Sequence, residues 1–490
     1  MKKKFWLHFL AISAAIVAIF TTTLLIISDK TLARAGKECD TISIVATFNE
    51  VTKTLTATQT IDYKNRTGQT LNEVRFHIYA NAYRKDAINP PVAPNEPQAY
   101  PNGKSFGGIA VHSVKVGSLV EHKISGADGT VLIVPVNGFK AGSVARIVMD
   151  YTITLANIKH RLGFTNDAIN LANFYPVPVV FENGSWQEYP YSHNGDPFYN
   201  DVFNFDVKLT APKNLVIASS GTEIKPRHFK STAIRDFAIV MSKNFQILHK
   251  NMGGIAVNYF YLNDNSPQKS LEVACNAVKT FSNLFTKYPY RQLSVVQTDF
   301  LHGGMEYGEL VYIARDMLKN QAERSEHEYV IVHEIAHQWW YGVVGNNQSS
   351  TAWIDEGLAE YSSMLYYDYN PDPNFKRAEM IKNSRASYNS YLKIIKGLGI
   401  QTDATMNRDL NDFVTPMEYV YMTYVRGFLL FCDLEDLLSR DALLKSLKEF
   451  SHNTMFKTAS QKALVNTIEQ TTKRKVGLFF DTYLVGINLF

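Results

Sequence analysis

The chain has 490 residues, more than one hydrophobic core usually serves, so it should divide into two or three domains. Its composition is that of an ordinary globular protein, with 46% hydrophobic and 20% charged residues. The net charge of +4 is small, and no basic stripe or nucleic-acid motif accompanies it, which argues against a DNA or RNA partner.

The first 35 residues predict export. Three lysines at positions 2–4 precede residues 5–28, which are uncharged apart from a possible charge on His8 and long enough to cross a bilayer. The positive-inside rule places the lysines in the cytoplasm and everything after residue 30 outside. Residues 1–35 are expected to be a membrane anchor, or a signal peptide cleaved near Ala35, where Ala33-Arg34-Ala35 fits a cleavage site. The length of the apolar run favours the anchor, and both alternatives make the rest of the chain extracytoplasmic.

From Thr41 to about residue 250 the hydrophobic pattern has a period of two. Apolar side chains alternate with polar ones in residues 54–63 and again in residues 203–209, and turn signals such as residues 65–68 separate the runs. We expect residues 41–248 to form a β-sheet domain with antiparallel pairing. A proline-rich stretch, residues 90–101, is interpreted as an ordered loop within it.

After about residue 250 the pattern changes. Apolar residues between Leu271 and Phe285 recur at helical spacing, a short strand is expected at residues 293–297, and the chain is mostly helical from Ser325 onward. Residues 249–490 should therefore form a second, mixed α/β domain. The fold class predicted for the whole chain is α+β.

Residues 329–342 read YVIVHEIAHQWWYG, an apolar and aromatic helix that carries two histidines and a glutamate. His333 and His337 are four residues apart, so on a helix they share a face, about 6 Å apart along the axis, where both can reach one metal ion. Glu334 points about 100° away and flanks such a site without joining it. In this HExxH arrangement the glutamate activates a water on the metal. The alternative is two histidines whose hydrogen bonds are satisfied within the core.

A catalytic zinc site needs a third protein ligand. Glu356, in WIDEGLAEY, follows His337 by nineteen residues, and a turn at residues 342–350 would let a returning helix present it beside the histidines. Glu360 lies one turn further along the same face. It could accept the remaining N–H of a ligand histidine, or it could be a solvent-exposed carboxylate.

Together HEIAHQWW and WIDEGLAEY resemble the gluzincin metallopeptidases of the aminopeptidase N and leukotriene hydrolase family. The resemblance implies one Zn2+ ion held by His333, His337 and Glu356, with Glu334 as the base. It also implies a β-domain followed by a thermolysin-like catalytic domain. The given sequence closes with FFDTYLVGINLF, so it is interpreted as a short form without the C-terminal helical domain of many relatives.

A second family element is found upstream. Gly303-Gly304-Met305-Glu306-Tyr307 resembles the family's Gly-x-Met-Glu-Asn motif on an edge strand. The resemblance implies that Glu306 binds the free α-amine of the substrate and that Gly303, Gly304 and Met305 contact its backbone. Tyr307 departs from the usual Asn. Residues 174–190 do not reproduce the family loop that lends further substrate contacts, so no site residue is assigned there.

A third element is Tyr424-Val425-Arg426-Gly427, which resembles the family's Tyr-x-Lys/Arg-Gly stretch. The resemblance implies that the Tyr424 phenol hydrogen-bonds the oxyanion formed on the attacked carbonyl. Tyr419 and Tyr421 are interpreted as ordinary buried aromatic residues.

These expectations combine into a zinc-dependent aminopeptidase that hydrolyses the N-terminal peptide bond of peptides through a zinc-bound water activated by Glu334. Its partners would be peptides with a free N-terminus and, through residues 1–35, a membrane. The alternatives are a zinc endopeptidase, should Glu306 not bind amines, and an inactive membrane-anchored homologue that only binds peptides. The sequence does not predict an oligomeric state.

Overall fold

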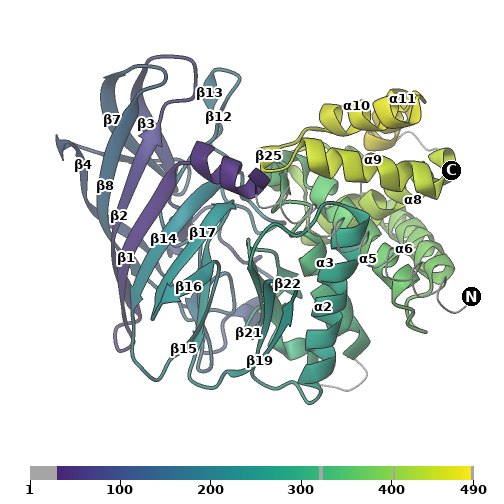
Figure 1. The fold of residues 1–490 in the computed structure, drawn as a ribbon, viewed down its shortest axis with the longest axis horizontal. Helices are drawn as coiled ribbons and strands as arrows, with labels where there is room; N and C mark the ends of the chain where they lie inside the picture. Colours follow the sequence, from purple (N-terminus) through teal and green to yellow (C-terminus); the bar gives the residue numbers. More distant parts are fainter. Residues whose placement is uncertain (1–29, 319–323, 401–402, 487–490) are drawn as a thin grey trace, which may run out of the picture.

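The computed structural model describes residues 30–318, 324–400 and 403–486. Strands dominate residues 41–242, here called the β-rich part, and helices dominate residues 246–486, here called the mixed part. Figure 1 shows the two parts side by side, with the sheets of the β-rich part at one end and helices α6 to α11 at the other. The α+β class expected from the hydrophobic pattern is therefore confirmed.

The β-rich part holds an eight-stranded sheet in the order β16-β17-β14-β1-β2-β8-β4-β5 and two four-stranded sheets, β15-β18-β10-β9 and β11-β3-β7-β6. The strands of the large sheet are β1 (Thr41–Asn49), β2 (Thr54–Lys64), β4 (Gly108–Val116), β5 (Ser118–Leu119), β8 (Val144–Thr154), β14 (Phe203–Thr210), β16 (Thr222–Lys225) and β17 (His228–Ile234). Those of the smaller sheets are β3 (Leu71–His77), β6 (Lys123–Ser125), β7 (Val131–Phe139), β9 (Leu162–Phe164), β10 (Ile169–Ala172), β11 (Val177–Pro178), β15 (Val216–Ser219) and β18 (Ala238–Ser242). A hairpin, β12 (Phe181–Glu182) and β13 (Ser185–Trp186), stands apart from these sheets.

Alternation of side chains explains the large sheet. In β1 the even-numbered residues from Ile42 to Phe48 are buried, while Thr41 and Val45 are exposed. The expectation of antiparallel pairing throughout is wrong at one place, because β1 pairs with β14 in parallel. A period of two gives the buried face of a strand but not the direction of its neighbour, since that depends on the connection between them.

The mixed part begins with a five-stranded sheet in the order β19-β20-β21-β23-β22. Its strands are β19 (Gln246–Met252), β20 (Ile255–Tyr261), β21 (Gln292–Thr298), β22 (Gly304–Met305) and β23 (Leu310–Ala314), and β22 forms one edge. The predicted domain boundary at residues 248 and 249 falls inside β19. The helices of this part are α2 (Pro267–Leu284), α3 (Arg324–Ala336), α4 (Gln348–Thr351), α5 (Trp353–Tyr369), α6 (Arg377–Gly397), α7 (Pro416–Val420), α8 (Arg426–Leu438), α9 (Arg440–Asn453), α10 (Gln461–Thr472) and α11 (Gly477–Leu484).

Helix α3 crosses the core of the mixed part. Its last six residues, 331–336, are all buried, so this half of the helix is enclosed on every side, as its apolar sequence predicts. Trp339, Trp340 and Trp353 are at most 1% exposed and pack around it as expected. The connection expected as a plain turn at residues 342–350 contains a short strand, β24 (Val344–Gly345), which pairs with β25 (Lys457–Thr458), and the single turn α4.

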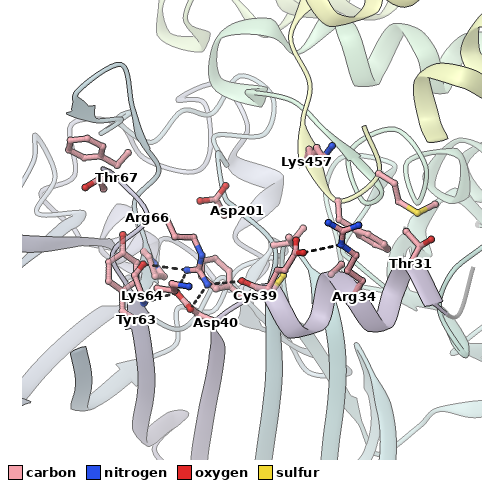
Figure 2. Close-up of a pocket in the computed structure, with 18 of the residues that line it drawn as sticks. Thr31, Arg34, Cys39, Asp40, Tyr63, Lys64, Arg66, Thr67, Asp201 and Lys457 are labelled. Atoms are coloured by element: carbon pink, nitrogen blue, oxygen red, sulfur yellow. Dashed lines mark hydrogen bonds and ion pairs between the residues drawn. The ribbon is translucent and has the colours of Figure 1, made fainter. Parts of the chain in front are cut away.

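Residues 30–38 form a helix that lies across the junction of the two parts. Between this helix, the β-rich part and residues 452–457 is a cavity of about 510 Å³, in which Figure 2 shows Asp40 paired with Arg66 and Asp201 facing inward. None of the predicted site residues lines it.

Most of the predicted membrane anchor, residues 1–29, lies outside the described residues. Within the ranges that the structure describes, no helix combines the length and the apolar character needed to cross a bilayer.

Candidate metal centre and active site

His333 of α3, His337 in the turn directly after that helix and Glu356 of α5 bring three donor atoms together. Nε2 of His337 lies 3.1 Å from Nε2 of His333 and 3.2 Å from Oε2 of Glu356, and the His333 nitrogen is 3.3 Å from the same oxygen. All three side chains are buried. The His337 N–H still bonds the His333 carbonyl oxygen at 3.3 Å, which keeps the two histidines at helical spacing, and α5 brings in the carboxylate.

This triangle has the size of one face of a tetrahedral zinc site. Zinc bonds of about 2.0–2.1 Å place neighbouring ligands about 3.3 Å apart in a tetrahedron. Two imidazole nitrogens and one carboxylate oxygen form a donor set that catalytic zinc sites use, with a fourth position left for water or substrate. The residues therefore fit a zinc ion.

The charges of the triangle agree with this fit. Burial alone would raise the pKa of Glu356, but the His337 and His333 imidazoles outweigh it and hold that pKa well below its ordinary value. Burial alone would lower the pKa of His337, but the nearby carboxylates, Glu356 first, raise it to about 10. The buried carboxylates thus stabilise positive charge at the place where a metal cation would lie.

The other ring nitrogen of each histidine lies close to an oxygen atom, in a hydrogen bond for His337 and an ion-pair contact for His333. Nδ1 of His337 is 2.9 Å from the Trp340 carbonyl oxygen, and Nδ1 of His333 is 3.2 Å from Oε1 of Glu360. Tyr329 donates its hydroxyl proton to the second oxygen of Glu360. Glu360 is therefore not a free surface carboxylate, and both histidines are oriented from behind, as ligand histidines usually are.

Glu334 flanks the triangle. Its side chain is buried, and burial raises its pKa to about 7 despite the neighbouring histidines. Its Oε2 atom has no hydrogen-bond partner among the residues that the structure describes. A side chain at Gly304 would place Cβ 2.3 Å from the other oxygen, so only glycine at that position leaves room for the carboxylate. The unpartnered oxygen is available to a small polar molecule such as water.

Edge strand β22 carries Gly304 and Met305 and leads directly to Glu306, while Gly303 precedes it with a positive φ of 59°. Glu306 is buried and accepts a 2.7 Å hydrogen bond from Nε2 of Gln348, which also donates to Asp355 at 2.8 Å. Burial raises the pKa of Glu306 well above its ordinary value, and the neighbouring carboxylates add to this rise. Glu306 is therefore a buried acid that a cation would stabilise.

Tyr307, at the position where the family usually has Asn, is fully buried. Its ring packs edge-on against Tyr312, and its carbonyl oxygen accepts a 2.9 Å hydrogen bond from the Gln338 side chain. The side chain thus fills the core beneath β22. Compared with the family motif, this chain lacks the Asn side-chain amide at position 307 but keeps the preceding glutamate, Glu306.

Tyr424 enters from the other side, on a π-helical turn, residues Tyr421–Val425, between α7 and α8. Its hydroxyl donates a 2.6 Å hydrogen bond to Oε1 of Glu356, and its ring stacks on His333 at 5.9 Å between centroids. Such π-turns occur often at functional sites because they redirect one side chain. The phenol therefore lies at the edge of the donor triangle.

The part of the chain that carries this site is similar to known proteins. Residues 269–483 match the model of the peptidase family M1 domain. Aminopeptidase N of Lactobacillus helveticus is 24% identical over 255 residues, 47% of this chain and 28% of that protein. Aminopeptidase N of Lactococcus lactis subsp. lactis is 24% identical over 318 residues, 59% of this chain and 36% of that protein.

Residues 269–483 are therefore similar to the peptidase family M1 domain. The resemblance to aminopeptidase N that the motifs carry is confirmed. The crystal structure of an M1 zinc metallopeptidase from Deinococcus radiodurans is similar over 92% of this chain and 94% of that one, with a TM-score of 0.62 and 14% identity, a likeness in fold. The alignments span about a third of the length of the two curated relatives.

Three residues of the site were not found from the sequence. Asp196, in a loop of the β-rich part, places a carboxylate oxygen within 4.8 Å of oxygens of both Glu306 and Glu356. Arg161 donates to Asp196 and holds the Met305 sulfur at 3.2 Å. Asp355 places a carboxylate oxygen within 4.8 Å of an oxygen of Glu306 and a ring nitrogen of His337. Neither Asp196 nor Arg161 belongs to a motif, and only the fold brings them to the site.

Proposed function

We propose that this protein is a zinc aminopeptidase. The observation that carries the proposal is the meeting of three donor atoms within 3.1–3.3 Å beside the unpartnered oxygen of Glu334. When bound, the zinc ion would supply Lewis acidity to the attacking water and to the scissile carbonyl. Its protein ligands would be His333, His337 and Glu356.

Glu334 acts as the general base and then as the general acid. Its free Oε2 accepts a proton from the attacking water, and the same oxygen passes that proton to the leaving amine. Its pKa of about 7 suits both steps near neutral pH. The Tyr424 hydroxyl, which donates to Glu356 in this structure, turns its proton to the oxyanion of the tetrahedral intermediate.

Crowded carboxylates support amine recognition. Burial raises the pKa of Glu306 and also that of Asp196, whose oxygens lie within 4.8 Å of each other. Buried acids in such proximity are stabilised by a cation that shares them. The protonated N-terminus of a peptide is such a cation, and its position beside Glu356 sets the first peptide bond against the base. Cleavage would therefore remove one residue at a time.

The test compares fluorogenic aminoacyl amides that carry a free or an acetylated N-terminus. We expect cleavage of the free-amine substrates only, its loss on chelation and its return with Zn2+. Glu306→Gln should raise KM and lower kcat/KM by about 100-fold, the loss expected when a buried charged partner is removed. Glu309→Gln, which changes a buried glutamate bonded to Ser231 instead, is the matched control.

Equal cleavage of free and acetylated substrates would instead favour the endopeptidase alternative. A zinc-loaded protein that cleaves neither set would overturn the proposed function. An inactive peptide-binding homologue would bind the free-amine peptides without turnover.

We further propose that the protein is exported and held at the membrane by its N-terminus. The support is the sequence: three lysines followed by the uncharged run at residues 5–28. Fractionation of cells that express the full chain should place it in the membrane fraction after carbonate washing. Release of a product that begins near Gly36 would show cleavage as a signal peptide, and retention in the cytoplasm would contradict export.

A further inference from the structure

Two adjacent residues of the β-rich part contact the turn that follows α3 in the mixed part. Arg235 and Asp236 lie in the short connection between β17 and β18, and both are at most 2% exposed. Neither carries a role in the mechanism proposed above. Their hydrogen bonds converge on Tyr341, four residues after the metal ligand His337.

Arg235 joins three segments that are distant in sequence. Its guanidinium donates to the carbonyl oxygens of Tyr341 at 2.7 Å and Asn200 at 2.7 Å, and to that of Lys457 at 2.8 Å. A side chain at Gly345 would place Cβ 2.0 Å from the guanidinium carbon, so glycine there gives the arginine its space. The side chain is thus built into the junction between the β-rich part and the mixed part.

Asp236 holds the same tyrosine by its hydroxyl. Its carboxylate accepts hydrogen bonds from Tyr341 and from the side-chain amides of Asn173 at 3.0 Å and Asn200 at 2.8 Å. Tyr341 is therefore fixed at its backbone by Arg235 and at its side chain by Asp236. Its φ of 116° is a conformation that costs a non-glycine residue about 1–3 kcal/mol, so the surrounding contacts must impose it.

The peptide that precedes Tyr341 orients the metal ligand. The Trp340 carbonyl belongs to the peptide bond between residues 340 and 341, and it lies 2.9 Å from Nδ1 of His337. A proton on Nδ1 that is donated to this carbonyl leaves the lone pair of Nε2 for a metal. Any rotation of that peptide would turn the imidazole or remove its acceptor.

We propose that Arg235 and Asp236 are positioning residues for His337, so that the packing of the β-rich part on the turn at residues 340–345 sets the affinity of the metal site. The inference rests on the proposed zinc function. It assigns to the β-rich part a role in metal binding, although that part contributes no ligand.

The test measures metal binding by the full chain, without substrate. Zn2+ affinity comes from competition with a chromophoric chelator, and the visible spectrum of the Co2+-loaded protein reports the geometry of its ligands. Arg235→Lys and Asp236→Asn should weaken Zn2+ binding by about 10–100-fold, the usual effect of losing a partner behind a ligand histidine. Both should also change the Co2+ spectrum.

Arg227→Lys is the matched control. Arg227 also donates to three backbone carbonyls, those of Ala211, Pro212 and Leu215, but all three lie in the β-rich part. Its replacement should leave the affinity for Zn2+ within about threefold of the wild-type value, since no contact with residues 340–345 is lost. Should a variant at 235 or 236 fail to fold, Tyr341→Phe removes only the hydroxyl that Asp236 binds and should still change the Co2+ spectrum.

The outcomes separate the inference from the proposed function. Folded variants that bind Zn2+ as tightly as the wild type, with an unchanged Co2+ spectrum, would overturn the inference alone. A wild-type chain that binds neither metal would overturn the proposed function and the inference with it.

Discussion

Tyr424 is the residue whose chemistry is easiest to isolate. Its hydroxyl contacts Glu356, whereas its ring packs on His333. Tyr424→Phe keeps the ring and removes only the proton donor. We expect kcat to fall about 100-fold with KM nearly unchanged, because an oxyanion donor acts mainly in the transition state. Steady-state kinetics on a free aminoacyl amide, together with zinc content, would measure this.

Tyr421→Phe is the control, since the Tyr421 hydroxyl bonds Ser387 away from the donor triangle. A Tyr424→Phe enzyme with wild-type kcat and full zinc content would remove the phenol from the mechanism.

The buried Glu309 carboxyl should make the free energy of unfolding depend on pH. Burial raises its pKa to about 8, although hydrogen bonds from Ser231 and the Gly221 backbone oppose the rise. The unfolded chain, with a glutamate pKa near 4.3, releases this proton at a lower pH than the folded chain. The folded state therefore binds more protons between these values, so stability decreases as pH rises through that window and levels off above about 8.

Glu309→Gln should flatten this dependence. From pH 6 to pH 9 the wild type should lose about 2–3 kcal/mol more unfolding free energy than the variant, at 1.36 kcal/mol per pH unit. Denaturant unfolding at both pH values measures the difference, and the other titrating groups cancel between the two proteins. Parallel curves for the two proteins would contradict the buried, protonated state of Glu309.

Residue spacing predicted one half of the site and could not predict the other. An interval of four on a helix brings His333 and His337 together, and a short connection returns α5 with Glu356, so the sequence alone indicates their meeting. Asp196 lies in a loop that contains no motif, and its place beside Glu306 depends on how the β-rich part packs against the mixed part. Contacts of that kind are set by tertiary structure, which no local pattern encodes.

At the scale of elements, the site depends on how closely two helices approach. Gly357 of α5 faces Gly427 of α8, and a side chain at Gly427 would place Cβ 2.9 Å from the Gly357 Cα. The obstructing atoms belong to the backbone and cannot rotate away. The close contact keeps Glu356, next to Gly357, beside Tyr424.

Gly427→Ala should therefore separate α5 from α8. We expect a loss of about 1–3 kcal/mol in unfolding free energy, the usual cost of overpacking, together with weaker zinc binding. Urea unfolding and chelator competition measure the two effects. Gly397→Ala is the control, because no atom of the described residues lies within 4 Å of its added Cβ and alanine favours a helix. Equal stability of Gly427→Ala and the wild type would show that the helices can move apart freely.

The sequence predicts helices and strands most accurately where a single hydrophobic period continues without interruption. The mostly helical region expected from Ser325 onward opens with α3, Arg324–Ala336, and the strand expected at residues 293–297 is β21, Gln292–Thr298. Short elements were missed: β24 and α4 occupy the connection expected as a turn. A strand of two residues is too short to show a hydrophobic period. β24 exists only because β25, more than a hundred residues later, pairs with it.

At the scale of the whole molecule, the site lies where the two parts meet. The mixed part supplies the donor triangle, while the β-rich part supplies Asp196 and Arg161. Separate segments, α3, the turn that follows it and α5, thus carry residues that the same cation would hold together. A bound metal should therefore stabilise the assembled molecule and not only its ligands.

Removal of zinc tests this stabilisation. A ligand that binds only the folded state adds about 4 kcal/mol at a free concentration a thousand times its dissociation constant. The zinc-loaded chain should therefore unfold at a higher temperature than the chelated chain, with a midpoint that rises with zinc concentration. Scanning calorimetry with and without chelator measures the shift. His337→Ala removes one donor from the triangle and should abolish most of it. An equal shift in the wild type and His337→Ala would mean that zinc acts elsewhere on the chain, because the triangle could not then be its site.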